Sequence, residues 1–557
     1  MIVSITGRTH LGNCSHAIHY KLNSNSSFPR SNPPFVTSVS FQRQLHVMSS
    51  YVFLALQLAV VSLLVTLWRA FQPNTWSNRV VSYIINRLLL WWYPIYSTDG
   101  STPIPTYPYR FPDGGGSLKF LEGENVSRQW AEQYGSVYRI WVGLTPEIIL
   151  TRADEIKTVF KDSGNHYKAS NLNGGWVMGD LVGDGVGLIS QAHWKKVHAV
   201  VSPPFTQKPT TYVPFVQSRI SRHFSELYKE YEGGKTLRIK PAEDLKLLPF
   251  WVISDLLYGN LSPEMTEELL LITDLRTDVF QYAFKGGLSL FSTSKIFYPA
   301  IRNKLLVFHT RWANFNRKAY QYAKNRDDST ACAIVTLYRA VEQGQITPTE
   351  LMHTLDEALF ANIDVTIGSF SWIPQFLAEN AVLQSELRNE ITQTRSDETP
   401  ESWVKYIASN STLLASCINE SARLKPVTNY TYAQSMPSDR DVGGYRIPAG
   451  TFMVVDTNAL NIWDDAWGSD KMTFRPQRFL EESRASFRYR FWRFGFGPRQ
   501  CIAQALADTI LKVLVAYTVE NYELKSSGKS AVNEEDAQKR GEAWFKVAEQ
   551  EIILEAL

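Results

Sequence analysis

The hydrophobic pattern divides the chain into a short N-terminal part and a long body. An uncharged run over residues 51–68 contains only three polar side chains, all of them uncharged. Apolar and polar residues do not alternate there with helical period, and a helix needs roughly 20 apolar residues to span a bilayer. We therefore predict a transmembrane anchor over 48–72, in preference to a buried core helix or a cleaved signal peptide.

The segments around this run contain no acidic residue before Asp99. Residues 1–47 are rich in Ser and Asn, and Met48 directly precedes the apolar run. We expect 1–47 to be a disordered or artefactual extension. Basic residues after the run favour a body on the cytosolic side, which predicts the endoplasmic reticulum membrane. The acid-free composition of 1–47 also resembles a mitochondrial presequence, so a mitochondrial location is the alternative.

The pattern after the apolar run predicts a linker and one large domain. Residues 73–116 end in the Pro- and Gly-rich stretch TPIPTYPYRFPDGGG, which is typical of a linker. Residues 117–557 show neither repeats nor a second linker, so we expect a single large domain there. SVYRIWVGLTPEIILTR predicts two short strands with a turn at Gly143, and GGYRIPAGTFMVVDT predicts further strands. Long helices are expected from about 215 to 425, which makes the fold class mainly α with a small β lobe.

Composition excludes several classes of protein. The net charge is +3, which does not indicate nucleic acid as a partner. The chain has four cysteines without CxxC spacing, too few and too scattered for a disulfide framework. They are Cys14, Cys332, Cys417 and Cys501.

Cys501 lies in a turn-rich loop that leads into an apolar helical stretch. Gly495, Gly497 and Arg499 precede it at alternate positions. Glycines allow sharp turns and close approach, and a helix start stabilises a thiolate. A lone thiolate without Cys or His partners at metal spacing does not form a zinc or iron–sulfur site. It suits the axial position of a haem iron, and a buried structural cysteine is the plainer alternative.

The loop FGFGPRQC resembles the haem-binding loop of the cytochrome P450 family, Phe-x-x-Gly-x-Arg-x-Cys. The four places are filled by Phe494, Gly497, Arg499 and Cys501. The family usually has Gly two residues after the Cys, where this chain has Ala503. The resemblance covers about residues 106–525 and implies the cytochrome P450 fold. It also implies that Cys501 ligates the metal of haem b, iron protoporphyrin IX, and that the other three residues line that cofactor.

Two further motifs of the family concern the surroundings of the haem. Glu420, Arg423 and Arg478 match its Glu-x-x-Arg pair and the Arg of its Pro-x-Arg-Phe loop, a triad that implies a structural role. HWKKVHAVVSPPF resembles its Trp-x-x-x-Arg helix, with Trp194 matching and His198 in place of the Arg that binds a haem propionate. Trp194 and His198 are thus expected to bind the cofactor, although a permanent charge is lost at 198 and a surface His is the alternative.

A third cation that the family often places near the propionates is replaced as well. The best alignment puts Gln434 at that position, before the strand leading into GGYRIP. The neutral amide weakens the contact with a propionate that the family's Arg or His would make.

The oxygen-handling helix departs furthest from the family. LFANIDVTIGSF resembles Ala-Gly-x-Asp-Thr-Thr, but Asn362 replaces the Gly and Val365 the first Thr. The resemblance implies that Asp364 and Thr366 help to deliver protons, with a solvated helix acid as the alternative for Asp364. A hydroxyl moved by one residue points about 100° away around a helix, so Thr366 substitutes only if the helix is locally unwound. Otherwise Asn362, a water chain or a substrate hydroxyl serves instead.

Electrons are expected from a separate protein. No flavin or nicotinamide fingerprint is present, so the resemblance implies NADPH electrons delivered by NADPH–cytochrome P450 reductase. An acid-free stretch lies between Glu482 and Asp508. It forms either a docking face for an acidic reductase or a solvated basic loop. Its arginines are Arg484, Arg488, Arg490, Arg493 and Arg499.

The predicted function follows from the resemblance. It implies a membrane-anchored monooxygenase that inserts one atom of O2 into a small apolar organic substrate and reduces the other atom to water. The style of the motifs favours fungal secondary metabolite biosynthesis. The first alternative is an isomerase, a dehydratase or an oxidative coupling enzyme of the same family, because Val365 replaces the usual Thr. The second is a haem-based ligand sensor.

Overall fold

The computed structural model describes residues 55–66, 68–231, 235–326, 332–396, 399–530 and 547–557. The chain divides into two units, Met1–Trp68 and Arg69–Leu557. In the first unit a helix covers 55–66 and its side chains are exposed. None of the helices within the described ranges is both long and apolar enough to cross a bilayer. The predicted extension 1–47, and part of the predicted anchor, lie outside the described residues.

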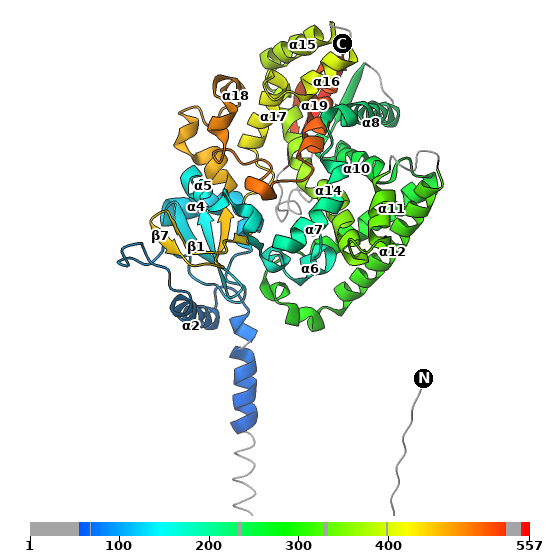
Figure 1. Ribbon diagram of the computed structural model, residues 1–557. Coiled ribbons are helices and arrows are strands. Elements are labelled where there is room, and N and C mark those ends of the chain that lie inside the picture. Colours follow the sequence, from blue (N-terminus) through cyan, green and yellow to red (C-terminus); the bar gives the residue numbers. More distant parts are fainter. Residues whose placement is uncertain (1–54, 67, 232–234, 327–331, 397–398, 531–546) are drawn as a thin grey trace, which may run out of the picture. The chain divides into compact units, whose positions relative to one another are not determined.

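The sheet lobe of the second unit contains the strands that the alternating pattern predicts (Figure 1). β1 (Val137–Val142) and β2 (Thr145–Leu150) form an antiparallel hairpin, and Gly143 in its turn has φ 59°. β8 (Phe452–Val455) pairs with β2 in parallel. β5 (Gln434–Ser435) and β3 (Tyr167–Lys168) complete the order β1-β2-β8-β5-β3. The lobe thus joins three distant parts of the chain.

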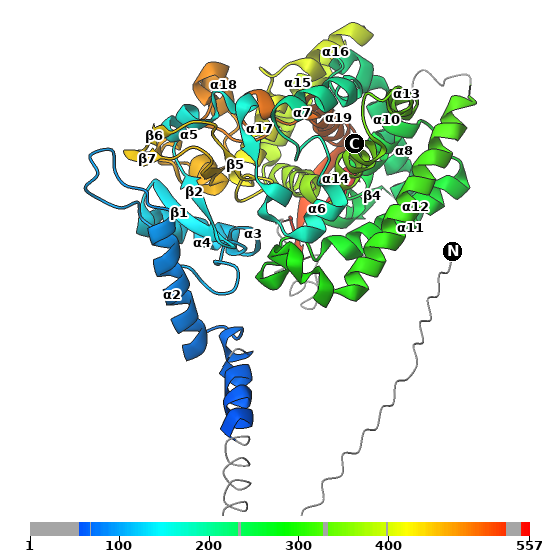
Figure 2. The same cartoon turned by 60° about the horizontal axis from the view of Figure 1, so that its bottom comes forward.

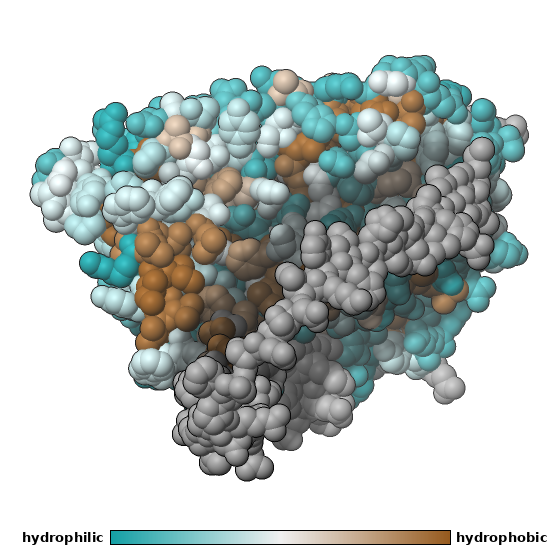
Figure 3. Space-filling view, turned by 90° about the horizontal axis from the view of Figure 1, so that it is seen from below, coloured by the Kyte–Doolittle hydropathy of each residue, from teal (hydrophilic) through white to brown (hydrophobic). Residues whose placement is uncertain are grey.

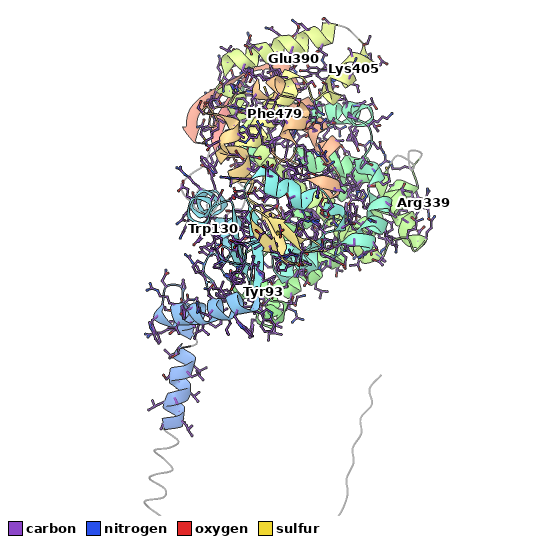
Figure 4. The ribbon with its side chains drawn as sticks, turned by 60° about the vertical axis from the view of Figure 1, so that its left-hand side comes forward. Tyr93, Trp130, Arg339, Glu390, Lys405 and Phe479 are labelled. Atoms are coloured by element: carbon purple, nitrogen blue, oxygen red, sulfur yellow. The ribbon has the colours of Figure 1, made fainter. Side chains whose placement is uncertain are left out.

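Smaller elements surround this sheet. β6 (Arg440–Val442) and β7 (Tyr445–Ile447) form a separate two-stranded hairpin. The helices α3 (Leu118–Leu121), α4 (Gly123–Tyr134) and α5 (Ala153–Phe160) also belong to this part of the chain. Trp130, labelled in Figure 4, comes from α4 and packs against Tyr107 and Tyr138.

The helical part confirms the prediction of long helices between about 215 and 425. Its longest member, α14 (Pro348–Ala378), begins with a capping box between Thr347 and Glu350 and runs through the middle of this part in Figures 1 and 2. The others are α8 (Pro209–Glu230), α10 (Leu248–Tyr258), α11 (Pro263–Phe280), α12 (Pro299–Lys324), α13 (Ala333–Glu342), α15 (Ala381–Ser396), α16 (Pro400–Ala408), α17 (Leu413–Leu424) and α19 (Gln504–Asn521).

One large apolar core joins these helices. Leu359 and Phe360 of α14 are fully buried in it, as are Leu506 and Leu514 of α19. A three-stranded sheet of β4 (Thr236–Ile239), β10 (Gln550–Ala556) and β9 (Tyr522–Ser530) closes one side. The sequence analysis does not predict this sheet, in which β10 pairs with β4 across more than 300 residues and with the nearby β9.

The expected linker 73–116 contains an element that its sequence does not predict. Helix α2 (Trp76–Trp92) occupies its first part. Leu89 of α2 is buried against Tyr109 and Trp141, and Trp141 belongs to the sheet lobe. The segment is therefore built into the second unit, and the proline-rich stretch packs along β1 through bridges at Thr106–Arg139 and Gly115–Trp141.

Candidate functional site

Two glycines in left-handed conformation shape the loop before Cys501. Gly495 has φ 89° and Gly497 φ 68°. A Cβ atom on Gly497 would lie 2.5 Å from both the Phe160 carbonyl oxygen and Ser163 Oγ, so this position has neither the backbone freedom nor the space for a larger residue. The loop closes when the Cys501 amide donates to the Phe494 carbonyl oxygen (2.7 Å).

The Cys501 thiol faces open space although it lies deep in the protein. Among the described cysteines Cys332 and Cys417 are buried, and Cys501 alone is exposed. Burial nevertheless raises the pKa of Cys501 to about 11, partly offset by the Ala503 amide at the start of α19. The helix-start effect is thus present but weaker than burial. A free thiol at this place is neutral, and coordination to a metal would remove its proton.

Arg499 reaches from this loop to helix α7 (Gln191–Val201). Its guanidinium lies 4.5 Å from the centre of the Trp194 ring, and its Nη2 donates to the Ile189 carbonyl oxygen (2.8 Å). The Trp194 and His198 rings are 4.8 Å apart. Burial and the nearby Arg499 lower the pKa of His198. The structure therefore brings these three predicted residues together.

Arg499 keeps an unused donor in this cluster. Its Nη1 is buried and has no hydrogen-bond partner within the described residues. Burial lowers the pKa of Arg499 to about 10, since its charge is poorly solvated. A buried guanidinium in this state favours an anion beside it.

Two charged residues that the sequence motifs do not mark join the cluster. Lys168 of β3 lies opposite Gln434 of β5, so both side chains lie on one side of the sheet. Burial and Arg499 lower the pKa of Lys168 to about 7. Glu357 of α14 accepts a hydrogen bond from the Gly187 amide (2.9 Å), and burial raises its pKa against the effects of Arg499 and Lys168.

The predicted Glu-Arg-Arg triad is present and buried. Arg423 donates two hydrogen bonds to Glu420 (2.8 and 2.9 Å), and Arg478 Nε donates a third to the same carboxylate (3.0 Å). The three side chains are at most 4% exposed. Each arginine also donates to main-chain carbonyls, for example Arg423 to that of Asn461. Mutual pairing therefore satisfies three buried charges.

Asn461 connects this triad to the cysteine loop. Its amide group donates to the Trp492 carbonyl oxygen (2.7 Å) and accepts from the Trp492 amide (2.9 Å). Trp492 lies directly before the RFGFGPRQC stretch, so the triad supports the start of the loop.

Helix α14 is continuous at the turn that would have to unwind for Thr366 to replace the missing Thr. Asn362 Nδ2 donates to the Ala358 carbonyl oxygen, and Thr366 Oγ1 donates to that of Asn362. The Thr366 hydroxyl is thus bonded to its own helix, and the unwinding it would need as a replacement for a Thr at position 365 is not observed. Asp364 belongs to the same helix, but its side chain lies outside what the structure describes.

The basic stretch is less free than its composition indicates. Arg490 pairs with Glu482 (2.9 Å) and Arg493 with Asp508 (2.6 Å), which are the acids that flank the stretch. Arg499 belongs to the cluster described above. The exposed guanidinium groups that are left belong to Arg484 and Arg488.

A cavity of about 400 Å³ adjoins the cluster, since Lys168 is part of its wall. Asp180 of α6 (Trp176–Val182) and Lys295 form an ion pair of 2.6 Å at this cavity. Further polar lining comes from Ser170, Asn171, Asp184 and Ser292, and the apolar residues include Trp176 and Leu188.

This set of side chains fits the haem implied by the sequence. An open sulfur, a buried guanidinium donor without a partner and the Lys168 cation surround one region. A metal-bound porphyrin would use the sulfur as ligand and place its two carboxylates among the cations.

Comparisons with known proteins agree with this geometry. A family model described as Cytochrome P450 matches residues 108–548. The chain is 79% identical to Cytochrome P450 monooxygenase roqR of Penicillium rubens over 523 residues, which is 92% of this chain and 100% of that protein. It is 42% identical to Cytochrome P450 monooxygenase aclC of Aspergillus oryzae over 434 residues, 78% of this chain and 87% of the other.

The fold has solved counterparts as well. A zebra fish cytochrome P450 structure with progesterone is similar with a TM-score of 0.60 and 17% identity, over 73% of this chain and 94% of that one. The family match, the fungal relatives and the arrangement around the cysteine loop show that the chain belongs to the cytochrome P450 family and is a fungal haem-thiolate monooxygenase.

Proposed function

We propose that Cys501 supplies the thiolate ligand of the haem iron. The observation that carries this proposal is the open face of its sulfur in a loop that only glycines can form, beside the Arg499–Trp194 pair. The other described cysteines are buried in the core and offer no open sulfur. The Phe494 carbonyl and the Gly497 turn hold the cysteine backbone in place, so these two residues position the ligand.

The cations around Arg499 hold the propionates in this proposal. The unused Nη1 of Arg499 donates to one carboxylate, and the Trp194 ring fixes the plane of the guanidinium. Lys168 supplies an amine beside Gln434, where the resemblance indicates that a cation is missing, and a propionate next to it would favour the protonated form. His198 adds a neutral hydrogen-bond donor, because Arg499 and burial disfavour its protonated form.

Bound haem supplies the activation of O2 and the transfer of one oxygen atom to the substrate, with two electrons from NADPH reducing the other atom to water. The protein's part is to exclude water and to deliver protons from α14. We assign proton delivery to Asp364, as the resemblance implies. The resemblance also implies Thr366, but its hydroxyl donates to the Asn362 carbonyl oxygen and takes part only if α14 opens there. Glu357 is an additional acid on this helix, and its raised pKa lets it hold a proton closer to neutral pH.

The substrate in this proposal is a small organic molecule with an apolar part that is oxidised. The charged lining of the adjoining cavity, with Asp180, Asp184 and Lys295, favours polar groups elsewhere on the same molecule. The named relatives are fungal monooxygenases, which supports a role in secondary metabolite biosynthesis.

Membrane anchoring and the electron donor belong to the same proposal. The apolar composition of 51–68 supports an anchor in the endoplasmic reticulum membrane with the body in the cytosol. NADPH–cytochrome P450 reductase is the proposed donor. We propose that the reductase docks on Arg484 and Arg488 of this chain. The other arginines of the basic stretch form ion pairs within the protein or lie in the haem cluster.

Isotope labelling tests the reaction. The full chain would be co-expressed with a fungal NADPH–cytochrome P450 reductase in a fungal host, and new metabolites would be compared under ordinary and 18O-labelled oxygen. Oxygen insertion predicts one labelled atom in each new product. New products without label would favour the alternative, an isomerase, dehydratase or coupling enzyme. Two observations favour this alternative: Val365 replaces the usual Thr, and the Thr366 hydroxyl is bonded to its own helix.

A further inference from the structure

Two side chains of α14 hold the segment 183–187, which contributes to the cavity wall. The Gly187 amide donates to Glu357 Oε2 (2.9 Å), and the Val186 amide donates to Thr354 Oγ1 (3.3 Å). A glutamine at position 357 would accept the same hydrogen bond through its amide oxygen. Holding the segment therefore does not require the negative charge of Glu357.

Two glycines of this segment leave room for the Glu357 carboxylate. A Cβ atom on Gly185 would lie 2.8 Å from Glu357 Oε2, and a Cβ atom on Gly187 would collide with Oε1. The carboxylate thus lies against bare backbone on this side. Within the described ranges Oε1 accepts no hydrogen bond, and Glu357 forms no ion pair. One carboxylate oxygen is therefore available to a ligand.

Glu357 faces the internal region that the sequence motifs assign to the haem. Burial raises the pKa of Glu357, although its side chain is only half-buried, so its open part faces space inside the protein. Its charge helps to raise the pKa of Cys501 and opposes the effect of burial on the pKa of Arg499 and of Lys168. A ligand held by Glu357 would therefore lie in the same region as these groups.

Charge pairing leaves Glu357 without a cation once the haem is bound. In the proposed function the propionates bind Arg499 and Lys168, so both charges are already neutralised. The neighbouring acid Asp356 has its own partner in Arg276 of α11 (3.2 Å). A buried carboxyl without a cation either holds a proton or pairs with a cation that a ligand brings.

The position of Glu357 also limits the kind of ligand. Figure 3 shows hydrophobic and hydrophilic side chains on the outer face of the underside, whereas the Glu357 carboxyl lies inside the protein. A protein or nucleic acid that docks on the surface would not reach it. The ligand that supplies the cation is therefore a small molecule that enters the protein.

We propose that Glu357 binds a basic nitrogen of the substrate, so that the substrate is an organic amine or another protonated nitrogen base with an apolar part. The protonated nitrogen donates to Oε1, while Oε2 keeps the Gly187 amide. This inference rests on the proposed function, because the propionates must occupy Arg499 and Lys168. Without substrate the carboxyl holds a proton, and the bound cation replaces that proton.

Ligand binding to the ferric, haem-loaded full chain tests this proposal without reductase or O2. The probes are 1-benzylpiperidine, which is protonated at neutral pH, and 1-benzoylpiperidine, a neutral amide of similar shape. Calorimetric titration gives the Kd of each probe. The Soret band, recorded before and after titration, shows that each variant holds haem and whether the probe nitrogen coordinates the iron.

Two variants separate the charge of Glu357 from its contact with the segment 183–187. Glu357→Gln keeps an oxygen for the Gly187 amide and removes the charge. Thr354→Val is the matched control, because it removes the other hydrogen bond to the same segment and keeps the charge. We expect wild type to bind 1-benzylpiperidine about 10- to 100-fold more tightly than 1-benzoylpiperidine, as for a charge-assisted hydrogen bond.

Glu357→Gln should lose this preference by weakening the binding of 1-benzylpiperidine alone. Thr354→Val should keep the preference, even if both probes bind more weakly. A wild type without preference, or a preference that persists in Glu357→Gln, would overturn the proposal. So would an equal loss of both probes in Glu357→Gln, since Glu357 then only holds the segment, or a red-shifted Soret band, since the nitrogen then binds the iron. Absence of a Soret band before titration would instead contradict the proposed function, and this inference with it.

Discussion

The cysteine loop and the oxygen-side turn of α14 differ in how firmly their surroundings hold them. The loop is fixed by two left-handed glycines, by the Asn461–Trp492 hydrogen bonds and, behind these, by the buried Glu420 triad. The turn around Asn362 is an ordinary helical segment whose polar side chains bond back to their own helix.

This difference explains why the fold tolerates the departures from the family pattern at positions 362 and 365. A Cβ atom at Gly497 would meet the Phe160 carbonyl oxygen, and loss of Glu420 behind the loop would leave two buried arginines without their partner. A change at positions 362 or 365 alters a side chain on a helix that remains intact. The loop before Cys501 is therefore constrained by folding, while side chains on this turn of α14 can change without altering the fold.

Removing the centre of the triad should have the largest effect. Glu420→Ala leaves Arg423 and Arg478 buried without their carboxylate, and we expect a loss of about 3–5 kcal/mol in the free energy of unfolding. Urea unfolding and the haem content of purified protein would measure it. Glu482→Ala removes the partner of the more exposed pair with Arg490, and it should cost no more than about 1 kcal/mol. Similar losses in both variants would mean that the triad does not support the loop.

Adding a methyl group to the cysteine loop, by Gly497→Ala, should have the second largest effect on stability. Gly444→Ala has open space and meets only the backbone penalty of a positive φ, about 1–2 kcal/mol. Gly497→Ala meets the same penalty and also the Phe160 carbonyl oxygen, so it should cost a further ~1–3 kcal/mol from overpacking. Thermal unfolding of both variants gives the difference directly. Equal destabilisation would show that the loop has room to adjust.

Haem retention should depend on the cation cluster. Arg499→Leu removes a charge-assisted hydrogen bond to a propionate, worth about 1.5–3 kcal/mol, and should release haem about 10- to 100-fold faster. Transfer of haem to an acceptor protein measures this rate. Arg488→Leu changes the charge equally on the surface and should leave the rate unchanged. Unaltered haem loss from Arg499→Leu would place the propionates elsewhere.

Lys168 allows a narrower version of this test. Lys168→Met should speed haem loss by less than Arg499→Leu does, because it removes a single flexible cation. The double change K168M/Q434R should restore the wild-type rate, since an arginine at 434 returns a cation to the same side of the sheet. If K168M/Q434R loses haem as fast as Lys168→Met, the cation at 168 does not take the place of the one missing at 434.

The variant expected to change the structure least is Val365→Thr in α14. Val365→Thr returns a hydroxyl to the position that the family uses, and it should raise the amount of product formed per NADPH oxidised without altering thermal stability. Thr366→Ala should leave this ratio unchanged, because the hydroxyl is bonded to the Asn362 carbonyl oxygen. A loss of coupling in Thr366→Ala would show that the helix opens during the reaction and that Thr366 delivers protons.

Local patterns in the sequence predicted the parts of the fold that depend on neighbours. Alternation with a glycine turn predicted the β1–β2 hairpin, and helical spacing placed Glu420 beside Arg423. Two motifs that resemble one family implied that Arg499 and Trp194 bind the same cofactor, and the two side chains lie in contact.

Features that depend on contacts between distant parts of the chain could not be predicted from the sequence. Lys168 and Glu357 carry no motif, and they join the cluster only because β3 and α14 meet near the cysteine loop. Helix α2 was hidden because its apolar side faces outward, and a proline-rich stretch follows it. The pKa of Cys501 rises because the effect of burial is larger than the lowering effect of the Ala503 amide at the helix start. The spacing of residues in the sequence does not show which of these effects is larger.

The carbon monoxide difference spectrum of the reduced full chain tests the central claim most directly. The account predicts the red-shifted absorption band of a thiolate-ligated haem in wild type and in Cys417→Ala, whose sulfur is buried in the core. Cys501→Ser should bind haem without showing that band. An unchanged band in Cys501→Ser, or no band in haem-loaded wild type, would contradict the assignment of Cys501 as the ligand.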